Sequence, residues 1–242
     1  MNRLQAQLSA LQQALIQPSG PPPSPAAVAN VAAFIRGIER KSKFVQLHST
    51  LLAGVRWDRL ESIGRRMPGG TGANHLTISL ADATLVIEHS EAVIDHVYMA
   101  FDGLTAALVN MTDTMGRLLR ARYQLQIPER GASLLSLKDH NQCVPTSPIG
   151  LVVNDTRYTE WLVKVRDLRG RCQHADIDHA LLGAEGPYSR RGEPFIRQDY
   201  YWQTPPKHVP LIAYGEEAAL AAEETLLAVI EAVLRAPQNP CV

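Results

Sequence analysis

A long stretch without proline, from Asp82 to Tyr123, constrains the fold of this 242-residue chain most strongly. Apolar residues recur along it every three or four positions, the spacing that places them on one face of an α-helix. They are Leu85, Val86, Ile94, Val97, Tyr98, Phe101, Leu104, Leu108, Met111, Met115, Leu118 and Leu119. We therefore expect a long helix, bent or divided at Gly103, whose methionines and aromatic residues belong to the core.

The same periodicity predicts further helices on both sides of this stretch. They cover residues 26–40, 44–67, 156–174 and 215–236. Leucines at spacings of three and four over residues 1–17 predict a helical arm, docked on the body of the protein or on a second copy. A stiff proline-rich linker over 18–25 follows the arm. The main domain then covers 26–236, and a tail covers 237–242.

Segments rich in proline and glycine separate the predicted helices. The glycine-rich residues 68–72 lack the spacing of a P-loop, so we expect a plain loop there. Residues 128–150 predict a polar connection. Further on, Phe195-Ile196 and residues 200–202 predict a short hairpin. The expected fold class is mainly α: a helical bundle with a short irregular or hairpin excursion before the last helix.

The charge balance excludes a global electrostatic attraction to nucleic acid or membrane, because 24 basic residues face 24 acidic ones. An anion site must therefore arise from local clustering of charge. Three cysteines, Cys143, Cys172 and Cys241, form no CxxC pair and are poor material for a disulfide framework. No apolar run approaches membrane-spanning length. We expect a cytoplasmic protein with no membrane partner.

Local clustering of charge occurs over residues 163–174, where Lys164, Arg166, Arg169 and Arg171 precede His174. Arginine offers phosphate a planar, permanently charged fork, and histidine exchanges protons near pH 7. Residues five apart lie about 140° apart on an ideal helix. A joint site of Arg169 and His174 therefore works best where the helix ends or bends, or where a second subunit completes it. The alternative is a solvated basic face whose terminal histidine the helix dipole favours.

The segment Arg169-Gly-Arg-Cys-Gln-His174 resembles the Arg-x(4–6)-His motif of the HEPN superfamily of helical-bundle proteins. The preceding aromatic and aliphatic residues 158–165 are similar to the family's motif helix. A polar residue often follows the arginine in the family, and Gly170 departs from that pattern. Arg166-Asp167 has the favoured dipeptide, but its distance from His174 exceeds the usual range. We therefore assign Arg169 as the motif arginine and keep Arg166 as the second choice.

This resemblance implies a metal-independent endoribonuclease without a cofactor. His174 would move a proton at the ribose 2′-hydroxyl or at the leaving oxygen, and Arg169 would stabilise charge on the phosphate. Arg166 and Arg171 would guide the RNA. The family also implies a homodimer and a role in toxin–antitoxin or antiphage defence systems, with an antitoxin as a possible partner. Other members are inactive and bind nucleotide, RNA or protein, and this alternative stays open.

Arg190 and Arg191 lie in an aromatic-rich segment over 188–202. Single-stranded nucleic acid commonly binds where rings stack on bases and guanidinium groups hold phosphates. We expect the rings to pack back onto the bundle. The two arginines are expected to contact the anionic substrate.

Four potential metal ligands follow one another closely: His174, Asp176, Asp178 and His179. Imidazoles and carboxylates bind zinc, manganese or iron. A metal-dependent hydrolase is therefore a second alternative, although we expect the two aspartates to pair with neighbouring arginines.

Overall fold

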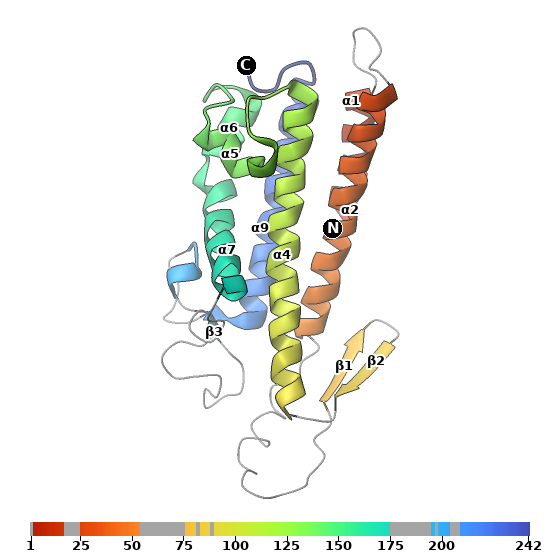
Figure 1. Ribbon diagram of the computed structural model, residues 1–242, viewed down its shortest axis with the longest axis vertical. Helices are drawn as coiled ribbons and strands as arrows, with labels where there is room; N and C mark the ends of the chain where they lie inside the picture. Colours follow the sequence, from red (N-terminus) through yellow and green to blue (C-terminus); the bar gives the residue numbers. More distant parts are fainter. Residues whose placement is uncertain are drawn as a thin grey trace, which may run out of the picture. The chain divides into compact units, whose positions relative to one another are not determined.

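The computed structural model describes residues 2–16, 25–53, 76–80, 83–87, 90–174, 195–196, 198–203 and 209–242. These residues are mainly helical, which confirms the predicted fold class (Figure 1). The α-helices are α1 (Asn2–Ile16), α2 (Pro25–Ala53), α4 (Ser90–Tyr123), α5 (Leu134–Asp139), α6 (Pro148–Asn154), α7 (Thr156–His174) and α9 (Leu211–Arg235). The shorter elements are β1 (Leu76–Leu80), β2 (Ala83–Ile87), η1 (Glu129–Gly131), β3 (Phe195–Ile196), η3 (Gln198–Tyr200) and β4 (Val209–Pro210).

The chain forms two compact units, and α2, α4, α7 and α9 each contribute one part to both. Unit 1 contains Met1–Lys43, Ala107–Val163 and Ala219–Val242. Unit 2 contains Phe44–Ala106 and Lys164–Ala218. None of the helices in the described ranges is long and apolar enough to cross a membrane.

In unit 1 the leucine stripe of α1 is buried. Leu4, Leu8, Leu11 and Leu15 are each at most 1% exposed. The Arg3 guanidinium also donates a hydrogen bond to Glu231 on α9, 3.5 Å away. The predicted arm therefore docks on the body of its own chain. Helix α2 begins at Pro25, a residue that suits the first turn because it needs no hydrogen-bond donor there.

The two helices expected over 26–40 and 44–67 form one continuous helix as far as Ala53. The expectation of a break after Arg40 is wrong, because Lys41 and Ser42 find partners within the helical arrangement. The Lys41 ammonium donates to the Thr114 hydroxyl at 2.9 Å, and the Ser42 hydroxyl donates to the Glu39 carbonyl at 2.9 Å. Residues 54–67, and the loop expected over 68–72, lie outside the described part of the chain.

The start of the predicted long helix is wrong. Helix α4 begins at Ser90, and Leu85 and Val86 belong to strand β2, where they pair with Ile78 and Thr77 of β1. Residues 76–80 alternate between apolar and hydroxyl side chains, and β-branched residues are frequent over 83–87. That pattern favours paired strands over a helix. The alternation over residues 76–80 indicates a strand, and the sequence analysis missed it because the apolar residues that follow also fit a helical spacing.

Gly103 neither divides nor ends α4, since the helix is continuous through it. Its role is to admit the ring of His48 from α2, within unit 2. A Cβ atom added at Gly103 would lie 2.3 Å from His48 Cε1 and 2.5 Å from its Nε2. The His48 Nδ1 and Asp102 Oδ1 atoms are buried, and neither has a hydrogen-bond partner among the described residues. Burial lowers the pKa of His48, and the nearby Asp102 carboxylate opposes that change.

This burial predicts a loss of stability in mild acid. Because the pKa of His48 in the folded state lies below its ordinary value of 6.5, the unfolded chain binds the proton more readily. The His48 contribution is therefore fully present above pH 6.5 and decreases as the pH falls below it. Urea unfolding at pH 7.5 and pH 5 should show a smaller acid loss for His48→Gln than for the wild type. The exposed His140, changed to Gln, should leave the acid loss as in the wild type; an acid loss unchanged in His48→Gln would contradict the assignment.

The polar connection predicted over residues 128–150 contains short helices: η1, α5 and the start of α6. A capping box begins α5: the Ser136 amide donates to the Ser133 hydroxyl at 3.0 Å, and the Ser133 amide donates to the Ser136 hydroxyl at 2.8 Å. A Cβ atom at Gly116 of α4 would lie 2.3 Å from the Ser133 carbonyl carbon. Gly116 therefore allows the start of α5 to pack directly on α4.

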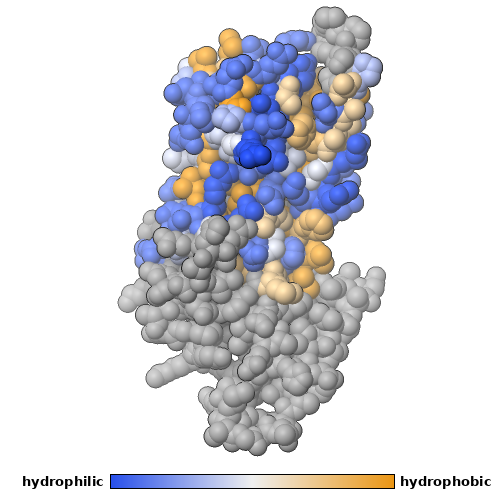
Figure 2. Space-filling model, viewed as in Figure 1, coloured by the Kyte–Doolittle hydropathy of each residue, from blue (hydrophilic) through white to orange (hydrophobic). Residues whose placement is uncertain are grey.

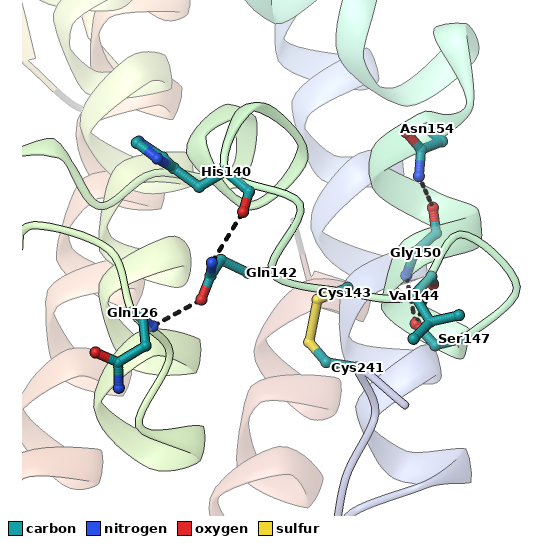
Figure 3. The surroundings of a disulfide bond; sticks show 9 residues. All are labelled: Gln126, His140, Gln142, Cys143, Val144, Ser147, Gly150, Asn154 and Cys241. Carbon is teal, nitrogen blue, oxygen red and sulfur yellow. Dashed lines mark hydrogen bonds between the residues drawn. A yellow bond between two sulfur atoms is a disulfide. The ribbon is translucent and has the colours of Figure 1, made fainter.

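Cys143 and Cys241 form a disulfide across 98 residues, although the sequence analysis judged the three cysteines poor material for a disulfide framework (Figure 3). Backbone hydrogen bonds hold the same two segments together. The Val144 amide donates to the Cys241 carbonyl at 2.8 Å, and the Ile149 amide donates to the Pro240 carbonyl at 2.9 Å. The C-terminal tail therefore returns to the loop between α5 and α6. Cysteine spacing in the sequence carries no signal of that return.

Removing the disulfide should destabilise the protein by about 2–4 kcal/mol, because it closes a long loop in the unfolded chain. Urea denaturation of a Cys143→Ala, Cys241→Ala double variant measures this loss. Dithiothreitol should lower the stability of the wild type to a similar level and leave the double variant unchanged. A wild type insensitive to the reductant would contradict the pairing.

The predicted hairpin has a different second strand. Phe195 and Ile196 pair with Pro210 and Val209 rather than with residues 200–202. Tyr200 and Tyr201 instead pack within unit 2, each 9% exposed, which confirms that these rings fold back onto the helices. The last helix also begins earlier than expected, at Leu211.

The described surface is mixed in character. On the face shown in Figure 2, hydrophilic residues predominate and hydrophobic residues lie in smaller groups between them. Large exposed apolar side chains include Phe44, Leu47 and Met99 in unit 2 and Leu151 and Leu220 in unit 1. Exposed apolar residues of this kind are ordinary on proteins and need no bound partner to explain them.

Candidate functional site

Helix α7 has the bounds that the sequence predicted, Thr156–His174. Asp155 starts it, because its carboxylate accepts a hydrogen bond from the Arg157 amide at 2.9 Å. The same carboxylate forms an ion pair with the Arg157 side chain at 2.5 Å, and that hydrogen-bonded pairing lowers the pKa of Asp155. Arg157 thus has a partner at the opposite end of the helix from the candidate site.

The inward face of α7 is apolar, as predicted. Trp161, Leu162, Val165 and Leu168 are completely buried. In unit 1 the Trp161 indole donates to the Thr225 hydroxyl at 2.9 Å, which satisfies its polar atom. These contacts fix how the helix is rotated about its axis, and so determine which of its other positions face the interior.

Arg169 lies on the inward side of α7, because it follows the buried Val165 by four residues and so shares its face. Its side chain is half-buried. The Nε atom is fully buried and has no hydrogen-bond partner among the described residues. Arg169 is therefore not part of a freely solvated basic face. A buried donor without a partner costs about 1–3 kcal/mol, so its presence calls for an explanation such as a bound ion or ligand.

Gly170, next to Arg169, has room beside it: a Cβ atom added there would meet no atom of the described residues within 4 Å. A polar side chain of the kind common at this position in the HEPN motif would therefore fit. Packing does not require the glycine. With glycine at position 170, the chain has no polar side chain directly after Arg169, and the backbone at Gly170 is less covered than it would be with a larger residue.

Lys164 and Arg166, the other described basic residues of this segment, already have interaction partners. The Lys164 ammonium donates to the Asp199 carbonyl at 2.8 Å, which ties η3 to α7 within unit 2. Arg166 is half-buried and has a noncovalent partner of its own. Neither is positioned as Arg169 is, with an unpartnered buried donor.

Arg171 and His174 occupy the last turn of α7, and the helix ends at His174. Their side chains lie outside the described part of the structure. By position, His174 is about 140° around an ideal helix from Arg169 and opposite Val165. The convergence of the two side chains remains a prediction.

Several other predicted site residues also lie outside the described residues: Arg190, Arg191, Asp176, Asp178 and His179. Across the ranges that the structure describes, no group of three or more histidine, cysteine, aspartate or glutamate side chains could hold a metal ion. The metal-dependent alternative therefore stays a sequence-based prediction.

Sequence reasoning missed the buried polar atoms on α2 and α4 of unit 2. His48 Nδ1, Ser49 Oγ and Asp102 Oδ1 are buried without a hydrogen-bond partner in the described ranges. A signal existed for His48, which stands three residues after Val45 and four before Leu52, both buried. A histidine at such an apolar-stripe position is a candidate for a constrained polar role.

No family model, curated protein or solved structure matches this chain. The function must therefore be inferred from the candidate site itself and from the resemblance of its motif.

The buried Arg169 Nε, which has no partner among the described residues, predicts an unusual response to mutation. Because the buried Arg169 Nε is unsatisfied, Arg169→Met should leave the free energy of unfolding unchanged or raise it by about 1 kcal/mol. The matched variant Arg166→Met removes a residue that has a partner and should lower stability. Urea denaturation of both variants measures the difference; a clear destabilisation by Arg169→Met alone would show that Arg169 serves the fold.

Proposed function

We propose that the end of α7 forms the site of a HEPN-type, metal-independent endoribonuclease. The observation that carries this proposal is the buried, unpartnered Arg169 Nε on the inward face of the helix. A phosphate oxygen would supply a charged hydrogen-bond acceptor for this atom. The resemblance of Arg169 and His174 to the HEPN motif supports phosphodiester chemistry over simple anion binding.

The proposed reaction is a transesterification within RNA. The ribose 2′-oxygen attacks the adjacent phosphorus, the bond to the 5′-oxygen breaks, and a 2′,3′-cyclic phosphate and a 5′-hydroxyl result. His174 accepts the proton of the 2′-hydroxyl or gives a proton to the leaving 5′-oxygen, and water makes the other of these two proton transfers. Arg169 stabilises the charge that develops on the non-bridging oxygens. Arg166, Arg171, Arg190 and Arg191 would guide the RNA strand.

The angular separation of Arg169 and His174 makes a second copy of the chain part of the proposal. In a homodimer with facing α7 helices, His174 of one copy can meet Arg169 of the other. If the protein acts in toxin–antitoxin or antiphage defence, an antitoxin protein that covers this helix end would block the RNA.

The proposed location is the cytoplasm, where RNA substrates are present. Disulfides are rare in that compartment. We therefore expect Cys143 and Cys241 to be reduced there. The backbone hydrogen bonds from Val144 and Ile149 would then hold the C-terminal tail in place.

A non-catalytic nucleotide-, RNA- or protein-binding module is the second candidate. The position of His174, on the side of an ideal helix opposite Val165, favours it. In that case Arg169 would bind an anion without a proton-transfer partner. A metal-dependent hydrolase built on His174, Asp176, Asp178 and His179 is the third candidate, and it rests on the sequence alone.

RNA cleavage in EDTA tests the nuclease proposal. The wild type should cleave single-stranded RNA, and His174→Ala and Arg169→Ala should each lower the rate by at least about 100-fold. Two exposed residues provide matched controls: His140→Ala and Arg130→Ala should cleave as the wild type does. Equal cleavage by all five proteins would eliminate the assignment.

The same samples distinguish the other candidates. A binding module would not cleave RNA, yet would bind a fluorescent RNA oligonucleotide in a manner that Arg169→Ala weakens. A metal-dependent hydrolase would cleave only when manganese or zinc replaces the EDTA. Absence of both cleavage and RNA binding would remove RNA as the substrate class.

A further inference from the structure

A cavity of about 350 Å³ lies in unit 1, and its walls come from α1, α2 and the end of α4 with the residue that follows it. Its size falls in the range of about 300–1,000 Å³ typical of small-molecule sites. The lining is mostly apolar: Leu15, Ala26, Val28, Val31, Phe34, Leu118 and Ala121, with the polar residues Asn30, Arg122 and Gln124. Arg122 is the single charged residue of this described lining.

Arg122 resembles Arg169 in one respect: its Nε atom is buried and has no hydrogen-bond partner among the described residues. Its guanidinium carbon lies 5.4 Å from the centre of the Tyr123 ring. A stacking contact of this kind supplies no hydrogen-bond acceptor and no counter-charge. A guanidinium beside apolar walls therefore gains most from an anion brought in from solution.

The neighbouring phenol cannot serve as that anion. Tyr123 donates its hydroxyl hydrogen to the Pro237 carbonyl at 3.1 Å, which holds the ring in place. Burial raises the pKa of Tyr123 to about 12, so the phenol is neutral at physiological pH. The counter-charge for Arg122 must therefore come from elsewhere.

We propose that this cavity binds a carboxylate with an aliphatic chain. The carboxylate pairs with Arg122 and the chain lies against Leu15, Val31 and Phe34. The Asn30 and Gln124 amides are further hydrogen-bond donors in the lining. All these residues belong to unit 1, whereas Arg169 belongs to unit 2, so the proposal does not depend on the nuclease proposal.

Isothermal titration of the full chain with decanoate, decanol and decylamine tests the chemical class of the ligand. Decanoate should bind at least about 10-fold more tightly than decanol, because a hydrogen-bonded charge adds about 1.5–3 kcal/mol. Decylamine should not compete with decanoate. Equal binding of the acid and the alcohol, or no binding of decanoate up to millimolar concentration, would overturn the proposal.

Variants test the named residues. Arg122→Gln should weaken decanoate binding at least about 10-fold and leave decanol binding unchanged. Arg117→Gln is the matched control, because Arg117 is an exposed arginine of the same helix outside the lining. Ala121→Trp, at an exposed lining position, should block both ligands, and circular dichroism confirms that each variant is folded. Unchanged decanoate binding in either Arg122→Gln or Ala121→Trp would contradict the assigned site.

Discussion

The enclosure of α4 is the constraint on which the rest of the structure depends. Between residues 104 and 119 this helix has buried residues around most of its circumference, so it needs neighbours on several sides. Its buried threonines remain satisfied by bonds to their own helix; the Thr112 hydroxyl, for example, donates to the Val109 carbonyl at 2.8 Å. Because α4 contributes to both compact units, its close contacts shape each of them. Gly116 admits the start of α5 in unit 1, and Gly103 admits the His48 ring in unit 2.

Buried hydrogen-bond donors without a partner indicate where an external ligand could bind. Native proteins leave few buried polar atoms without a hydrogen bond. In this chain Arg122 of unit 1 and Arg169 of unit 2 each have a buried Nε without a described partner. The two arginines lie on different helices and in different surroundings: one lines an apolar cavity, and the other lies next to an open glycine position near the end of α7. We infer two anion sites of different chemistry, one for an aliphatic carboxylate and one for an RNA phosphate.

The sequence predicted those features that depend on local periodicity. The leucine stripe of α1 and the bounds of α7 follow from apolar spacing. Features that depend on distant pairing were missed or wrong. The disulfide joins Cys143 to Cys241, which follows α9. The second strand of the hairpin is β4, which directly precedes α9. Both pairings join segments that are far apart in the sequence or separated by other elements. Leu85 and Val86 fit both a helical and a strand pattern, and the pairing with β1 decides between them. The lack of a partner for an arginine atom has no signature in the sequence, so the sequence analysis did not single out Arg122.

Binding of a phosphate oxygen by the Arg169 side chain is tested most directly by ¹⁵N NMR of the arginine Nε–H groups. The Arg169 signal is assigned by its loss in Arg169→Lys, and a non-cleavable RNA carrying a 2′-O-methyl group at each position is then titrated in. We expect the Arg169 Nε–H signal to shift and its exchange with water to slow on saturation, as a new charged hydrogen bond requires. An Arg169 signal that stays unchanged while the RNA demonstrably binds would contradict the account.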